Sequence, residues 1–97
     1  MQGVTLNYAE ALKWYRLAAA QGFTPAQLNI GVAYGRGQGV ARDLVRAHMW
    51  LSIAAASGSA NAIKSRDIVA QNMSSQQIAA AEKSARECQA RKLKGCD

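Results

Sequence analysis

The sequence has little of what disordered, membrane-spanning or sheet-rich chains require. A single proline, 19% charged residues and 49% hydrophobic residues exclude a disordered chain, which would be rich in charge or proline. No apolar run approaches the roughly 20 residues that span a bilayer, so we expect no transmembrane segment. Valine, isoleucine, threonine and phenylalanine are scarce, which disfavours a sheet. The 97 residues are enough for one domain with one modest core.

Alanine, in contrast, makes up twenty of the 97 residues. It is the best helix former, and its small side chain lets neighbouring helices pack closely. The composition therefore predicts an all-α fold.

The chain is also basic, because twelve Lys and Arg residues against six Asp and Glu residues give a formal charge of +6. A field of this sign attracts acidic partners weakly. The basic residues are spread along the chain, however, and nucleic-acid recognition needs them clustered with stacking aromatics. The sequence therefore predicts no specific nucleic-acid partner.

The chain repeats itself with a period of 36 residues. Residues 2–26 align with residues 38–62, and ten of these 25 pairs are identical. The identities include Trp14 with Trp50, and the alanine run 18–20 with the run 54–56. A period of this length is typical of stacked helical hairpins, none of which can bury its apolar face alone.

Five helices are predicted, near residues 8–21, 25–35, 44–57, 60–72 and 75–92. Each begins at or just after a residue of a type that caps helix N-termini, namely Asn7, Thr24, Asp43, Ser59 and Ser74. Three of these residues have a capping-box partner three positions later, in the pairs Asn7–Glu10, Thr24–Gln27 and Ser74–Gln77. Glycines follow the first three helices, where they permit a left-handed backbone.

Small and large apolar residues form one stripe on the first helix and again on the third. The stripes are Ala11, Trp14, Tyr15 and Ala18, and then Ala47, Trp50, Leu51 and Ala54. This helical spacing predicts that both tryptophans occupy equivalent packed positions in the core, with a ligand-binding aromatic cage as the alternative. His48 lies outside the stripe, so we expect its imidazole to be exposed, either to solvent or as part of a binding surface.

These residues resemble the Sel1-like repeat, a relative of the tetratricopeptide repeat. The family pattern is A-x-x-W-Y-x-x-A-A-x-x-G, then A-x-x-x-L-G-x-x-Y, then G-x-G-V-x-x-D. The chain departs from it only in having isoleucine for leucine at Ile30, and it supplies Ala11, Trp14, Tyr15, Ala18, Ala19, Gly22, Ala26, Gly31, Tyr34, Gly37, Gly39, Val40 and Asp43. The match extends over residues 2–62, and residues 63–73 have lost the signature.

The resemblance implies an α/α superhelix, that is, a solenoid of stacked helical hairpins with a C-terminal capping helix. Residues 1–97 would form one domain, with repeats at 2–37 and 38–73 and a capping helix and tail at 74–97. The concave face would hold a partner protein or peptide. Its groove positions map onto Leu28, Asn29, Val32, Arg36, Lys64, Ser65, Ile68 and Asn72. Asn29 could bond a peptide backbone, and Arg36 or Lys64 could hold a carboxylate, although each position alone is as well explained by a solvated face.

The start of the chain departs from the repeat pattern. Met1 stands where the pattern has a glycine, and the first helix of the hairpin is absent. We therefore expect the C-terminal end of a longer array, or a shortened chain. The uncovered face of the first helix then predicts either self-association or marginal stability at this end.

No motif for catalysis, metal binding or cofactor binding is present. The sequence has no HExxH motif or nucleophile elbow, and His48 is its only histidine. The glycine-rich stretch 35–39 follows a helix rather than a strand, so it is a repeat turn and not a phosphate-binding loop. We expect a non-enzymatic protein without a cofactor or metal.

The two cysteines, Cys88 and Cys96, are eight residues apart. On a continuous helix their Cα atoms would be about 12 Å apart, which is too far for a bridge. Gly95 lets the helix end and the chain turn back, so we predict a disulfide outside the repeat core, with two free thiols as the alternative. A bridge would place the protein in the periplasm or outside the cell, and free thiols would place it in the cytoplasm. The resemblance agrees with export, since many bacterial Sel1-like proteins are exported.

Three functions agree with these observations. The first is an adaptor that binds a partner protein or peptide on its concave face. The second is an exported cell-envelope accessory factor whose basic surface meets an anionic polymer, a contact that salt would weaken. The third is a purely structural role at the C-terminal end of a longer repeat array.

Overall fold

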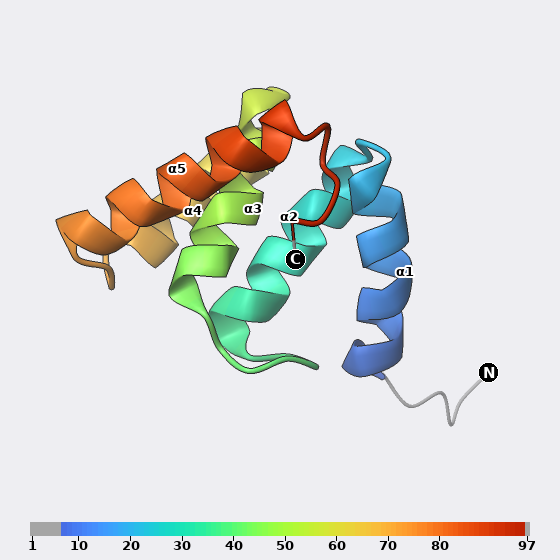
Figure 1. Ribbon diagram of the computed structural model, residues 1–97. Helices are drawn as coiled ribbons and strands as arrows, with labels where there is room; N and C mark the ends of the chain where they lie inside the picture. Colours follow the sequence, from blue (N-terminus) through green and yellow to red (C-terminus); the bar gives the residue numbers. More distant parts are fainter. Residues whose placement is uncertain (1–6, 97) are drawn as a thin grey trace.

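The computed structural model describes residues 7–96, which form five helices and contain no strand. The helices are α1 (Tyr8–Ala20), α2 (Thr24–Arg36), α3 (Leu44–Ala56), α4 (Ala60–Ala70) and α5 (Ser75–Ala90), shown in Figure 1. The predicted all-α fold is confirmed, and each predicted boundary lies within two residues of the observed one. The expectations for Met1 and for residues 2–6 lie outside the described residues.

Side-chain caps fix the start of four helices. The side-chain oxygens of Asn7, Asp43, Ser59 and Ser74 each accept a hydrogen bond from the backbone N–H three residues later. At α5 the Gln77 side chain also accepts from the Ser74 backbone N–H, which completes the predicted capping box. Each bond satisfies an amide that a helix N-terminus otherwise leaves without a partner.

The fifth cap, predicted at Thr24, is wrong by one residue. Phe23 is the N-cap of α2 and makes no side-chain capping bond, while Pro25 lies in the first turn, where its missing N–H removes no helical bond. The predicted partner Gln27 is buried and donates from Nε2 to the carbonyl oxygen of Ala19 at 3.2 Å. The Gln27 side chain therefore ties α2 to the end of α1 instead of closing a capping box.

The helices pack in a sequential array around α3 (Figure 1). Helix α3 contacts α2, α4 and α5, whereas α1 packs against α2. Helix α2 also approaches α4, so alternate helices lie side by side over α3. One cluster of buried core residues comes from α1, α2, α3 and α5: Leu12, Ala19, Ala26, Ile30, Ala33, Tyr34, Ala47, Met49, Trp50, Ile53, Ala85 and Cys88. Helix α4 contributes Ala62, which is also fully buried. The arrangement agrees with the predicted solenoid of helical hairpins.

Gly31 permits the closest approach between two of these helices. A Cβ atom at Gly31 would lie 2.6 Å from Leu51 Cγ and 3.2 Å from the Ala47 carbonyl oxygen. Real Cβ atoms do not approach neighbours so closely, so α2 can reach α3 at this point only without a side chain.

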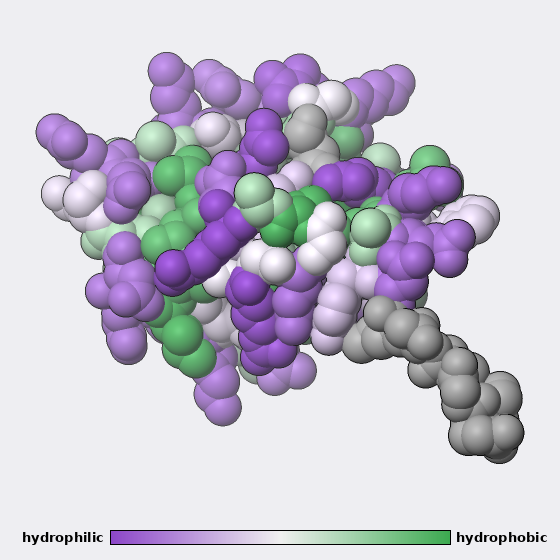
Figure 2. Space-filling model, turned by 90° about the horizontal axis from the view of Figure 1, so that it is seen from below, coloured by the Kyte–Doolittle hydropathy of each residue, from purple (hydrophilic) through white to green (hydrophobic). Residues whose placement is uncertain are grey.

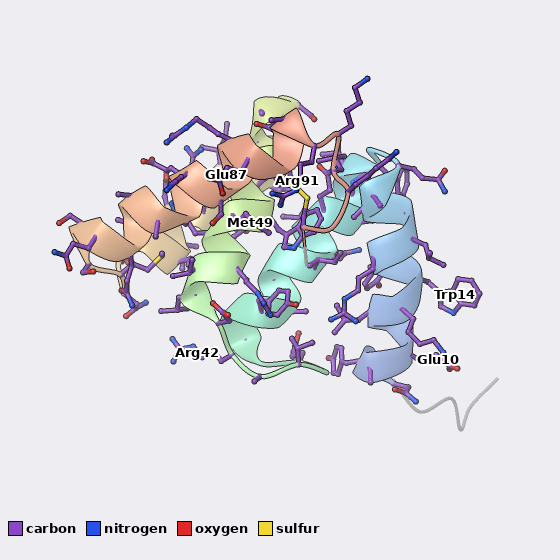
Figure 3. The ribbon with its side chains drawn as sticks, in the orientation of Figure 1. Glu10, Trp14, Arg42, Met49, Glu87 and Arg91 are labelled. Atoms are coloured by element: carbon purple, nitrogen blue, oxygen red, sulfur yellow. A yellow bond between two sulfur atoms is a disulfide. The ribbon has the colours of Figure 1, made fainter. Side chains whose placement is uncertain are left out.

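The two tryptophans do not share one environment. Trp50 is 2% exposed, as predicted, but Trp14 is 65% exposed and points away from the other helices in Figure 3. Leu17 and Phe23 are also exposed near it in the chain. The prediction of a packed Trp14 is wrong because no described helix covers the outer face of α1. Self-association through this face stays a prediction.

His48 is buried, so the prediction of an exposed imidazole is wrong. It is 3% exposed, and Ser52 Oγ lies within hydrogen-bonding distance of its Nδ1 at 3.2 Å. Burial, followed by the positive charge of Arg66, lowers the pKa of His48, while the charges of Glu82 and Asp67 act in the opposite direction. The repeat equivalent of His48 is Leu12, which is also buried, so this position faces the core in both periods.

The segment after α5 turns back over the core, drawn in red in Figure 1, and is closed by a disulfide between Cys88 and Cys96. The turn uses left-handed backbone at Lys92 and Leu93, and the Leu93 N–H donates to the Cys88 carbonyl oxygen at 2.9 Å. Leu93 and Cys96 pack against the core cluster. The predicted bridge is present. The bridge was expected to lie outside the repeat core, however, and Cys88 has no exposed surface and belongs to the core.

Among residues 7–96 no helix is long and apolar enough to cross a membrane.

Candidate functional site

A cavity of about 170 Å³ opens between α2 and α4, and α3 contributes to its wall. We call it the α2–α4 groove and define it by the residues that line it: Val32, Gly35, Arg36, Arg42, Leu44, Leu51, Ser65, Ile68, Val69 and Asn72. Arg42 lies at the lower end of the molecule in Figure 3. Figure 2 views the molecule from that end and shows hydrophobic surface among hydrophilic side chains.

Five of the eight residues predicted for the concave face line this groove: Val32, Arg36, Ser65, Ile68 and Asn72. Two pairs among them, Val32 with Ile68 and Arg36 with Asn72, are separated by the repeat period of 36 residues. Equivalent positions of α2 and of α4 with the turn after it therefore face one cavity. This follows from the geometry of the array, in which alternate helices lie side by side.

The other three predicted residues lie elsewhere. Asn29 lines a smaller cavity of about 120 Å³ between α1 and α2, which shares Val32 with the α2–α4 groove. Leu28 is half-buried and Lys64 is exposed. Neither of these two lines the α2–α4 groove.

Sequence reasoning missed the other five lining residues, Gly35, Arg42, Leu44, Leu51 and Val69. It placed the groove on α2 and α4 alone, but α3 and the loop before it close one end. Arg42 directly precedes the capping residue Asp43, so its position in the G-x-G-V-x-x-D turn was the available signal. Leu51 is fully buried and forms the apolar base.

The charged side chains that line the groove are positive. Of the residues 7–96, those that line it include the guanidinium groups of Arg36 and Arg42 and no carboxylate. Arg42 donates from Nε to the carbonyl oxygen of Gly35 at 3.2 Å, which fixes the direction of its side chain. The nearest carboxylate in the sequence, Asp43, caps α3 and pairs with Arg46 at 3.8 Å instead. The groove therefore combines an apolar base with a positive rim.

A larger cavity of about 280 Å³ lies where α5 crosses α3, around Met49, Glu87 and Arg91 in Figure 3. Within the described part of the chain, its wall contains two carboxylates and two guanidinium groups, from Asp43, Glu87, Arg46 and Arg91. Because these charges balance, the cavity offers a ligand no preferred sign, and we do not consider it the binding site despite its volume.

Nothing in the described part of the chain forms a cluster of His, Cys, Asp or Glu side chains suited to a metal ion. Both cysteines are in the disulfide.

The family model of the Sel1 repeat matches residues 2–23 and 24–59. The second match contains the whole hairpin of α2 and α3, and the first contains α1. The chain belongs to the Sel1 repeat family. Sel1 repeats are in general protein–protein interaction modules and non-enzymatic scaffolds. No curated protein and no solved structure matches the chain.

Proposed function

We propose that this Sel1 repeat protein is an adaptor that holds a segment of a partner protein in the α2–α4 groove. The observation that carries the proposal is the convergence of repeat-equivalent residues, from α2 and from α4 with the turn after it, on one cavity. An apolar base with a few polar groups at its edge is typical of ligand sites. Ser65 and Asn72 offer a hydroxyl and an amide that can bond a peptide backbone.

The groove is suited to one short segment rather than to a broad interface. A volume of about 170 Å³ accommodates one or two side chains. The long, partly exposed Ile68 gives the segment an apolar wall without being needed for the core. This proposal includes three expectations from the sequence. They are the assignment of the eight concave-face residues, the division into repeats at residues 2–37 and 38–73, and the capping role of residues 74–97.

The test is selection of binding peptides from a random-peptide phage library, followed by affinity measurement with two variants of α4. Ile68→Ser removes the apolar wall of the groove, and Ile63→Ser is the matched control. Both isoleucines are exposed, at 56% and 40%, and Ile63 does not line the groove. The expected result is loss of peptide affinity in Ile68→Ser alone. Recovery of no binding peptide, or equal affinity of both variants, contradicts the proposal.

A further inference from the structure

We propose that the α2–α4 groove selects an acidic peptide segment, in which a large apolar side chain enters the cavity and a neighbouring carboxylate pairs with Arg36 and Arg42. This inference rests on the proposed peptide-binding function and adds the chemistry of the ligand.

The first argument is charge complementarity. Arg36 is the last residue of α2 and Arg42 lies in the loop before α3, and the same cavity is lined by both. Neither guanidinium forms an ion pair with a residue in the range 7–96. The formal charge of +6 adds a weak long-range attraction of the same sign. An acidic ligand would supply the carboxylate that the groove lacks, and a basic ligand would be repelled.

The second argument is the orientation of Arg42. Its Nε donates to the Gly35 carbonyl oxygen, which leaves the two terminal nitrogens as donors. A guanidinium held in this way loses less freedom when it binds a carboxylate than an unattached side chain would. Arginine also pairs with a carboxylate through two parallel hydrogen bonds, which gives direction as well as attraction.

The third argument is the apolar base. Val32, Leu44, Leu51 and Val69 line the cavity below the charged rim. A cavity of roughly 150 Å³ is sufficient for a benzene-sized group, so the groove can accept one leucine- or phenylalanine-sized side chain. Charge alone would attract any polyanion, whereas this apolar base binds more tightly a peptide that carries an apolar residue next to its carboxylate.

The experiment compares the peptides selected by the wild type with those selected by a charge-reversed protein. The probes are the sequences recovered from a random-peptide phage library and their synthetic copies, each made with Asp and Glu and again with Asn and Gln. The test variant is Arg36→Glu combined with Arg42→Glu. The control is Arg86→Glu on the exposed surface of α5, which does not line the groove. Circular dichroism verifies that both variants keep their helices.

We expect wild-type selection to enrich Asp or Glu next to a large apolar residue. The affinity for such a peptide should fall about tenfold or more in the double variant and on replacement of the acids by amides, because a charge-assisted bidentate contact is lost. The double variant should instead enrich Lys or Arg at the same position, while Arg86→Glu behaves like the wild type. Affinity should also decrease with added salt.

Three outcomes overturn the inference. If the selected peptides bind in the groove without enrichment of acids, the proposed function stands and the ligand chemistry is wrong. If acidic peptides bind the double variant as well as the wild type, the acidic preference arises elsewhere on the basic surface. If heparin or polyphosphate competes as well as the selected peptide, and peptides without apolar residues bind equally, the groove is a polyanion site. The absence of any Ile68-dependent peptide, in contrast, defeats the proposed function itself.

Discussion

Trp14 and Trp50 occupy the same position in consecutive 36-residue periods, yet the first is 65% exposed and the second is 2% exposed. The difference comes from their neighbours. Helix α3 packs against α2, α4 and α5, whereas the main helix contact of α1 within residues 7–96 is with α2. One residue of the repeat is thus a core residue in α3 and a surface residue in α1.

The first prediction compares truncation at these two positions. Trp50→Ala should lower the free energy of unfolding by about 3–5 kcal/mol, as large-to-small changes in a core do, which is most of the stability of a small domain. Trp14→Ala should change it by no more than about 0.5 kcal/mol, because the side chain is exposed. Urea denaturation followed by circular dichroism measures both. Equal losses would contradict the exposed position of Trp14 and would agree with its burial by a second copy of the chain.

The second prediction compares two glycines of α2. Gly31→Ala should destabilise the fold by about 1–3 kcal/mol, because its Cβ atom would collide with Leu51 and force α2 and α3 apart. Gly35→Ala is the matched control, since its Cβ atom would lie 3.6 Å from Val69 Cγ2, an ordinary contact. The better helix propensity of alanine should there raise the stability by up to about 1 kcal/mol. Thermal unfolding of the two variants should shift in opposite directions, and a parallel shift would contradict the close approach at Gly31.

The helices and their caps were predictable because they depend on local chemistry. Asn7, Asp43, Ser59 and Ser74 bond to amides three residues away, so the sequence nearby contains all the necessary information. Thr24 shows where this reasoning fails. The partner it would have needed, Gln27, is engaged with Ala19 of the preceding helix, a contact that local sequence does not reveal.

The burial of individual side chains and the lining of the α2–α4 groove depend on which helices become neighbours in the fold. The repeat period predicts equivalent positions for Trp14 and Trp50, but their burial differs because different helices pack around α1 and α3. His48 was expected at the surface because it lies outside the apolar stripe of α3, as Leu12 does in α1, yet both side chains are buried. The period did relate Val32 to Ile68 and Arg36 to Asn72, since solenoid geometry brings equivalent positions together. Arg42 was missed because loop residues have no helical register.

The third prediction concerns the Cys88–Cys96 bridge. Thiol counting on unfolded, unreduced protein from an oxidising compartment should find no free thiol. Cys96→Ser should lower the free energy of unfolding by about 2.5 kcal/mol, the chain-entropy value for so short a loop. Cys88→Ser should lower it further, by about 1–3 kcal/mol, because it also places a hydroxyl in the core.

Equal losses for the two serine variants would contradict the core position of Cys88. Two free thiols per chain would contradict the bridge. The bridge is compatible with an oxidising compartment. Export to the periplasm or beyond is a proposal, and the same thiol count on protein isolated from each cell fraction tests it.

The fourth prediction concerns the dependence of stability on pH. His48 of α3 faces Arg66 and Asp67 of α4 and Glu82 of α5, and Ser52 lies beside it on its own helix. Burial, with the charge of Arg66, lowers its pKa in the folded protein below the ordinary value of 6.5. As the pH falls through about 6.5, the unfolded chain therefore binds a proton that the folded chain does not. The contribution of His48 to stability is complete above this pH and is lost progressively below it, with a slope of at most about 1.4 kcal/mol per pH unit.

Urea denaturation between about pH 7.5 and pH 5.5 measures this slope, because this range brackets the ordinary pKa of a histidine side chain. The control is His48→Leu, because leucine is the residue that the repeat has at the equivalent buried position, Leu12. Without the imidazole, the stability should become nearly independent of pH in this range. It should equal or exceed that of the wild type at the acidic end, since a buried leucine has no proton to bind. A wild type that is more stable at pH 5.5 than at pH 7.5 would contradict the lowered pKa, and a pH dependence that persists in His48→Leu would assign it to other groups.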